Sequence, residues 1–173
     1  MKKIIFITFL VIITLGFSIP KNLEKRINKE IISVFDIESY DIELIVIEEG
    51  IQTELFVPFD NENFYKILGG NTLLGFYYYG TAPSKADHFD YVVIFDKDMI
   101  IKKIKILAYR EDYGGEISSK RWLNQFKDLT KDDHVVYRKD IKAISGATIS
   151  ARSMTKSIND LLKSLAIIQS KNQ

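Results

Sequence analysis

The sequence contains no cysteine, only three prolines and almost no net charge. The absence of cysteine excludes disulfides, thiolate metal sites, a cysteine nucleophile and a lipid-modified cysteine. The 24 basic and 23 acidic side chains leave a net charge of +1, which argues against nucleic acid as the main partner. Because 46% of the residues are hydrophobic, the chain is also too apolar to be disordered. Any redox chemistry of this protein must therefore come from a cofactor.

Residues 1–19 differ in composition from the rest of the chain. Lys2 and Lys3 precede an uncharged run, mainly of Ile, Phe, Leu and Val, that extends from Ile4 to Ile19. As a helix this run would be roughly 24 Å long, which is shorter than the roughly 30 Å hydrocarbon core of a bilayer. We therefore predict a signal peptide or a membrane anchor over residues 1–19, and a working domain over residues 20–173. Either alternative makes the domain membrane-anchored or secreted, on the outer side of the cytoplasmic membrane.

Hydrophobic periodicity predicts an α+β fold, in which helices pack on an antiparallel sheet. We expect strands at 41–47, 54–57, 64–68, 73–79, 88–95 and 99–109, a short edge strand at 135–137, and helices at 22–35 and 117–126. A last long helix is expected to begin near Ser150. Its core-facing stripe, at helical spacing, consists of Met154, Ile158, Leu161, Leu162 and Leu165.

A turn of small residues, 145–148, leads directly into this last helix. Free backbone N–H groups and the helix dipole stabilise an anion at such a position. No acidic residue lies between Asp140 and Asp160, whereas this window contains the basic residues Lys142, Arg152 and Lys156. A helix commonly carries Asp or Glu in its first turn. The pattern therefore predicts an anion-binding turn, although an ordinary Ser/Thr-capped helix shares the same spacing.

Two motifs in this chain resemble those of a known family. Ser145-Gly146-Ala147-Thr148 resembles the flavinylation motif of the FMN-binding domain family, which includes the FMN-carrying subunits of sodium-pumping NADH:quinone reductase and of Rnf-type complexes. The stretch from Tyr109 to Ile117, with the helix that carries Trp122 behind it, resembles the glycine loop of the same family. The resemblance covers roughly residues 73–165, and two motifs in the right order are more specific than one.

The resemblance implies that FMN is the cofactor and that Thr148 carries it through a phosphoester, installed by an FAD-dependent flavin transferase. The phosphate would lie at the turn, near Ser145, Gly146 and Ala147. Helical spacing places Arg152 one turn further along the last helix and therefore on the same side. The flavin ring would lie near the glycine loop, in a slot bordered by Glu111, Tyr113, Gly114, Gly115, Glu116 and Trp122. The two carboxylates could bond ring N–H groups or tune the potential, or they could be ordinary loop charges.

Lys142 departs from the family pattern, which has an Asp three positions before the motif serine. An acid there could hold a metal ion or orient the acceptor hydroxyl during phosphoryl transfer. Lys142 could instead pair with the finished phosphodiester. The nearest acid on that side of the motif is Asp140, two residues earlier.

These features together predict an extracytoplasmic flavoprotein that exchanges electrons with a membrane or extracytoplasmic redox partner. The sequence has no nicotinamide fingerprint, no Ser-His-Asp set and no catalytic carboxylate pair, so we expect a carrier more than an enzyme. His88 and His134 lack ligand spacing and predict no metal site. Two alternatives stay open: a small flavin-dependent reductase outside the cytoplasm, and a non-flavinylated binding module that kept the fold.

Overall fold

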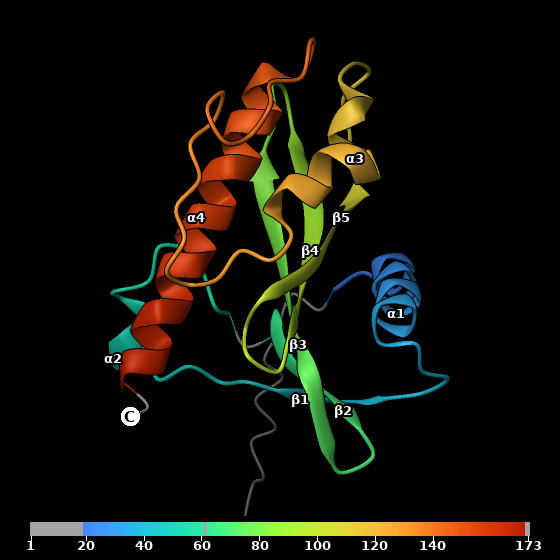
Figure 1. The fold of residues 1–173 in the computed structure, drawn as a ribbon, viewed down its shortest axis with the longest axis vertical. Coiled ribbons are helices and arrows are strands. Elements are labelled where there is room, and N and C mark those ends of the chain that lie inside the picture. The colour runs from blue at the N-terminus through green and yellow to red at the C-terminus, as the bar shows by residue number, and fades with distance from the viewer. Residues whose placement is uncertain (1–18, 61, 172–173) are drawn as a thin grey trace, which may run out of the picture.

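A five-stranded antiparallel sheet forms the centre of the molecule in the computed structural model, which describes residues 19–60 and 62–171 (Figure 1). Consecutive strands are neighbours: β1 (Asp41–Leu44), β2 (Phe64–Gly69), β3 (Thr72–Pro83), β4 (His88–Asp96) and β5 (Ile101–Ala108). The α+β class and the antiparallel sheet are thus confirmed. The signal peptide or anchor was predicted over residues 1–19, of which 1–18 lie outside the described residues, so it stays a prediction.

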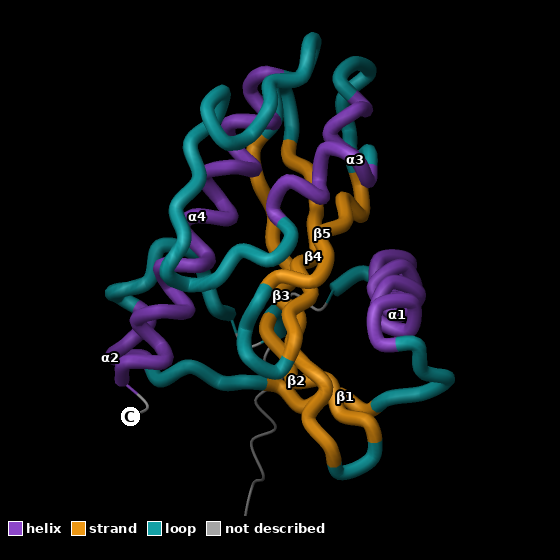
Figure 2. The backbone as a smooth tube through the Cα atoms, viewed as in Figure 1, coloured by secondary structure: helices purple, strands orange, loops and turns teal. Residues whose placement is uncertain are grey.

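Helices cover both faces of this sheet (Figure 2). The long helix α4 (Thr148–Lys171) packs on one face, and α1 (Lys21–Phe35) packs on the other. Three short elements share the α4 side of the core: η1 (Gly115–Ser118), α3 (Lys120–Leu123) and η2 (Asn124–Phe126). A single turn, α2 (Glu49–Gln52), lies between β1 and β2. In the described part of the chain, no helix is both long and apolar enough to span a bilayer.

The alternation of side chains along β4 explains why the sheet needs a helix on each face. Phe89, Tyr91 and Val93 contribute to the core under α4, whereas Val92 and Ile94 contribute to the core under α1. All five are at most 1% exposed. Successive residues of a strand point to opposite faces, so an apolar run of this kind must be covered on both. The apolar stripe of α4 is fully buried as predicted, which fixes the long helix against β3.

Three local predictions were wrong, and each failure has a physical reason. The expected strand at 54–57 is irregular, because Phe56 donates its backbone N–H to Ser164 Oγ (2.9 Å) on α4 instead of to a neighbouring strand. The expected strand at 135–137 is reduced to a single bridge between Tyr137 and Ile141. The expected helix at 117–126 is interrupted at Ser119, whose extended backbone and side-chain oxygen cap α3.

Replacing a buried residue of the α4 stripe tests this packing. Leu161 is 0% exposed, so Leu161→Ala should lower the free energy of unfolding by about 2–5 kcal/mol through lost burial and a residual cavity. Lys163 is exposed on the same helix and lies over the ring of Phe56, so Lys163→Ala should cost less than about 1 kcal/mol. Denaturant melts measure both values. Equal small losses would show that the stripe does not face the core.

Candidate functional site

Three segments that are distant in sequence meet at the end of the molecule where α4 begins. They are the turn 84–87 between β3 and β4, the segment 109–114 after β5, and the turn 145–147 before α4. In Figure 1 they lie at the upper end of the view. They border a groove of about 580 Å³, lined by Lys85, Ala86, Tyr109, Glu111, Asp112, Tyr113, Gly146, Ala147, Thr148, Ile149 and Ser150. The structure therefore brings residues of both sequence motifs to one site.

Gly114 makes the closest contact between the two motifs. Its φ of +81° is the left-handed conformation that favours glycine. A Cβ at this position would lie 2.6 Å from Ala147 Cβ and 3.0 Å from the Gly146 carbonyl oxygen. A Cβ at Gly115, in contrast, would meet no atom within 4 Å, and neither of the two glycines is among the residues that line the groove. Only the first glycine of the pair is therefore required for the approach of the two loops.

The turn before α4 presents a helix N-terminus to the groove. Gly146 has a φ of +78°, and the buried Ala147 donates its N–H to the carbonyl oxygen of Ile144 (3.3 Å). The helix starts at Thr148 and has no acidic residue in its first turn. Backbone N–H groups at such an end lack intrahelical partners and carry partial positive charge. The groove is accordingly suited to an anionic group near Thr148.

The hydroxyl groups of the motif differ in their surroundings. Thr148 is half-buried and lines the groove. Ser150 also lines it, but this side chain is buried and its Oγ lies 3.1 Å from the Tyr109 hydroxyl, within hydrogen-bond distance. Ser145 is exposed and lines a different pocket. Thr148 is consequently the motif hydroxyl that both lines the groove and is not engaged by Tyr109.

Glu111 ties two walls of the groove together. Its Oε1 accepts hydrogen bonds from Ser84 Oγ and from the backbone N–H groups of Ala86 (2.7 Å) and Asp87 (3.3 Å). These hydrogen bonds lower the pKa of the Glu111 carboxyl below its usual value, and the bond from the Ala86 N–H has the largest effect. The carboxylate therefore fixes the turn 84–87 against the segment that follows β5. The predicted contact with the flavin ring stays a prediction.

Apolar side chains flank Thr148 at the mouth of the groove. Tyr113 is 80% exposed and Ile149 is 49% exposed, although both are large hydrophobic groups. Tyr109 packs against Phe89, with 6.0 Å between ring centroids. A ligand that consists of a flat ring and an anionic group needs an apolar cleft for the ring and a positively charged position for the anion. The size of the groove, its aromatic walls and its helix N-terminus fit such a ligand.

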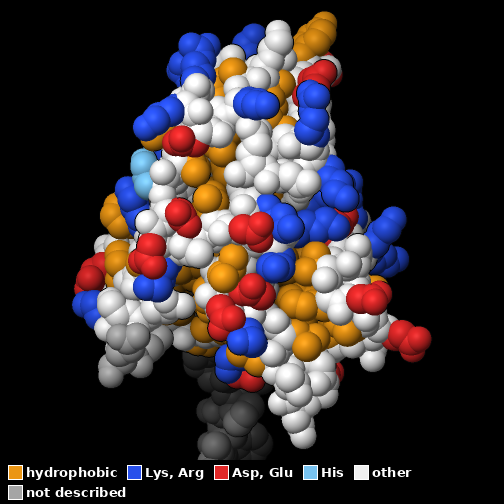
Figure 3. Space-filling model, in the orientation of Figure 1, with side chains coloured by type: hydrophobic (Ala, Val, Ile, Leu, Met, Phe, Trp, Pro, Cys, Tyr) orange, Lys and Arg blue, Asp and Glu red, His pale blue; other side chains and the backbone are white. Residues whose placement is uncertain are grey.

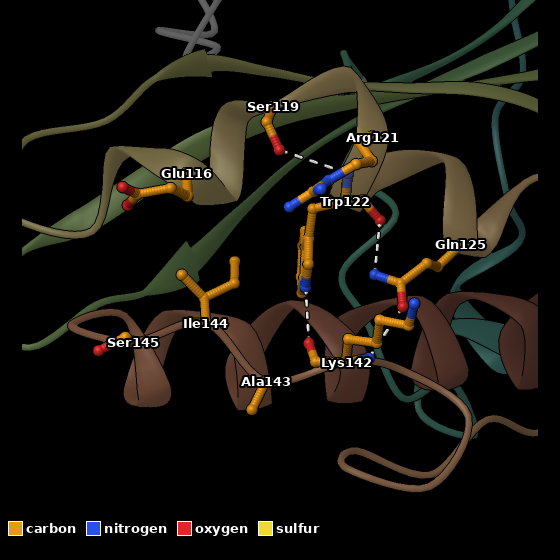
Figure 4. A pocket seen from close by; sticks show the side chains of 9 residues that line it. All are labelled: Glu116, Ser119, Arg121, Trp122, Gln125, Lys142, Ala143, Ile144 and Ser145. Carbon is orange, nitrogen blue, oxygen red and sulfur yellow. Dashed lines mark hydrogen bonds between the residues drawn. The ribbon is translucent and has the colours of Figure 1, made fainter.

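Several predicted site residues lie outside this groove. A second pocket of about 510 Å³ adjoins the same turn and is lined by Glu116, Ser119, Arg121, Trp122, Gln125, Lys142, Ala143, Ile144 and Ser145 (Figure 4). Trp122 is only 6% exposed and donates its Nε1–H to the Lys142 carbonyl oxygen (2.7 Å). Arg152 lies over the ring of Tyr137, 5.6 Å from its centroid. The structure thus places Glu116 and Trp122 in the second pocket and Arg152 against Tyr137.

Lys and Arg side chains lie at the upper end of the face shown in Figure 3 and also further down, with Asp and Glu side chains among them. The charged side chains that line the groove itself are Lys85, Glu111 and Asp112, so the partial positive charge offered to an anion near Thr148 comes from the N-terminus of α4. Among the described residues, no group of three His, Cys, Asp or Glu side chains could hold a metal ion.

Sequence reasoning missed several groove residues: Lys85, Ala86, Tyr109, Asp112 and Ile149. Lys85 and Ala86 belong to the tip of a hairpin whose first strand was predicted to end earlier, since β3 continues to Pro83. Tyr109 and Asp112 flank residues already singled out, and Ile149 follows the motif threonine directly. Proximity to the two motifs was therefore the available signal for three of the five.

Comparison with known proteins identifies a family over the part of the chain that contains most of the groove. Residues 86–163 match a family model described as the FMN-binding domain. The matched range contains β4, β5 and most of α4, together with both loops that carry the motifs. A comparison with curated proteins gave no match. The chain therefore contains an FMN-binding domain over residues 86–163, and its cofactor is FMN.

Proposed function

We propose that this protein is an electron carrier on the outer side of the cytoplasmic membrane, with FMN attached covalently to Thr148. The observation that carries the proposal is the position of Thr148, whose side chain lines the groove at a helix N-terminus free of acidic residues. An FMN phosphate bound there would meet backbone N–H groups and a nearby hydroxyl. Bound FMN would supply the redox chemistry, for which a chain without cysteine has no thiols of its own.

Attachment would follow the chemistry that the family resemblance implies. Thr148 would supply the oxygen that bonds to the FMN phosphorus of FAD, and the bond from that phosphorus to the AMP oxygen would break. AMP would leave, and the hydroxyl proton would pass to a base of the flavin transferase. Positioning and charge neutralisation govern such phosphoryl transfers. The groove is suited to both, because the turn fixes the hydroxyl and the helix N-terminus would face the phosphate.

The ring would lie in the outer part of the groove, against Tyr113 and Ile149. These two exposed side chains would then lose contact with water, which stabilises bound FMN. A ring held so near the surface could exchange electrons with a protein partner directly. The same openness would offer little enclosure to a small substrate, so it favours a carrier over a reductase.

Location outside the cytoplasm rests on the beginning of the chain. Lys2 and Lys3 precede the uncharged run from Ile4 to Ile19, and Lys21 follows it. A basic start before such a run is typical of a segment recognised by the export machinery. A covalent link would also be useful there, since a lost cofactor could not readily be replaced.

Removal of the acceptor hydroxyl is the direct test of attachment. When the chain is produced with a flavin transferase, Thr148→Ala should lose the covalent flavin, because no oxygen remains to form the phosphoester. Thr148→Ser should retain at least part of it, and Ser145→Ala should retain all of it. Peptide mass mapping after denaturation locates the adduct. A normally labelled Thr148→Ala protein, or an adduct on Ser150, would refute the assignment.

The two glycines of the loop provide a matched pair. Gly114→Ala should lower the free energy of unfolding by at least about 1–2 kcal/mol through left-handed backbone strain, and it should slow labelling by pushing against Ala147. Gly115→Ala should change stability by less than about 0.5 kcal/mol, since open space surrounds that position. Denaturant melts and labelling time courses measure both effects. Equal behaviour of the two variants would contradict the role of the Gly114 contact.

Export can be tested separately with C-terminal reporter fusions. The full chain fused to a phosphatase that needs an oxidising compartment should give activity, because the segment 1–19 directs the domain across the membrane. Deletion of residues 2–19 should abolish that activity and leave the fusion in the cytoplasm. Activity only from a reporter that functions in the cytoplasm would place the domain on the inner side.

A further inference from the structure

We propose that Trp122 and Gln125 are positioning residues for the segment 142–147, which leads directly into the acceptor Thr148. They would act by holding both backbone polar groups of Lys142, three residues before the motif serine. This inference rests on the proposed attachment at Thr148. It concerns how the chain fixes that hydroxyl and needs no contact of either side chain with FMN.

Two hydrogen bonds connect the short helical segment to Lys142. Trp122 donates its Nε1–H to the Lys142 carbonyl oxygen at 2.7 Å, and the Lys142 N–H donates to Gln125 Oε1 at 2.9 Å. A third bond, from Gln125 Nε2 to the Trp122 carbonyl oxygen at 2.9 Å, fixes the orientation of the Gln125 amide. Figure 4 shows these bonds between the helical segment and the turn. Both backbone groups of one turn residue are therefore bound by side chains of a separate element.

The segment 142–147 depends on these side-chain hydrogen bonds because its backbone forms few hydrogen bonds of its own. Residues 142–144 belong to neither helix nor strand, although the structure describes all of them. Within 142–147 the backbone–backbone bond found is the one from Ala147 N–H to the Ile144 carbonyl oxygen, at 3.3 Å. Ser145 and Gly146 are exposed. The bond from Trp122 of α3 to the Lys142 carbonyl oxygen is partly buried, where a polar backbone group needs a partner, whereas the bond to Gln125 of η2 lies at the surface.

The segment 142–147 is held at both of its ends. At the start of the turn, Trp122 and Gln125 hold Lys142. At its far end, buried Ala147 packs against Gly114, and the Ala151 N–H donates to the Ala147 carbonyl oxygen at 2.9 Å. Thr148 follows immediately. Loss of the first set of bonds should let the turn move about its remaining anchor and displace the hydroxyl, and small displacements of a reacting group cost much of its rate.

The Lys142 side chain takes no part in this arrangement. Only its backbone is bound by Trp122 and Gln125, and its side chain is exposed at the second pocket. The replacement of the family Asp by Lys at this position therefore leaves the positioning bonds intact. Variants of Trp122 and Gln125 therefore test the hydrogen bonds to the Lys142 backbone and leave the charge of the Lys142 side chain in place.

Paired variants of neighbouring amides test the proposal. Gln125→Ala should lower the rate of labelling at saturating flavin transferase by about 3–10-fold, the effect of a lost hydrogen bond of ordinary strength. Asn124→Ala, the same kind of truncation one residue earlier, should leave that rate unchanged. Gln125→Glu should restore only part of it, because a carboxylate oxygen can still accept from the Lys142 N–H but cannot donate to the Trp122 carbonyl oxygen. Trp122→Phe, which keeps a ring but removes the donor, should behave like Gln125→Ala.

Amide hydrogen exchange of the flavin-free full-length protein supplies a second measurement. In Gln125→Ala, the Ala147 amide should exchange faster although its own partner is untouched, while amides of β4 stay protected. Faster exchange throughout the molecule, or unchanged labelling of Gln125→Ala, would overturn the positioning role. If wild-type protein is not labelled at Thr148, the proposed attachment fails, and the exchange of Ala147 still decides whether the turn depends on Gln125.

Discussion

The close approach of Gly114 to Ala147 is the contact on which the cofactor site depends. A side chain at position 114 would meet Ala147 Cβ at 2.6 Å, so the two loops can come together only at a glycine with its φ of +81°. This contact joins the segment after β5 to the turn before α4. Glu111, in the same segment, then binds the turn 84–87. One small residue thereby allows three segments to enclose a single groove.

The contact between Gly114 and Ala147 also affects which hydroxyl groups line the groove. With Ala147 buried against Gly114, Thr148 begins the helix at the groove wall, and Ser150 is turned inward to Tyr109. The absence of acidic residues from the first turn of α4 leaves its N-terminus suited to an anionic ligand. In the proposed attachment, the phosphate of FMN would lie at that end and its flat ring beside Tyr113 and Ile149. Thr148 and Ser150 both carry hydroxyl groups, and the difference between them in this site comes from how deeply each side chain is buried.

Periodic features of this chain could be predicted from its sequence, whereas contacts made by irregular segments could not. The α4 stripe and the strands from Phe64 onward follow repeats that depend on local geometry alone. The predicted strand at 54–57 failed because Ser164, more than a hundred residues later, binds its backbone. The position of Arg152 over Tyr137 could not be predicted, because Tyr137 belongs to a loop without periodicity, and the expected role of Arg152 at the phosphate stays a prediction. The hydrogen bond from Trp122 to the Lys142 carbonyl oxygen follows from no sequence pattern either, and the assignment of Trp122 to the flavin slot stays a prediction.

A structure of the flavin-loaded protein tests the attachment at Thr148 most directly. We expect electron density for the ring in the groove beside Tyr113 and Ile149, continuous through the phosphate with the side-chain oxygen of Thr148. Density for FMN in the pocket beside Trp122 and Lys142, or a phosphate bonded to Ser145, would contradict that attachment.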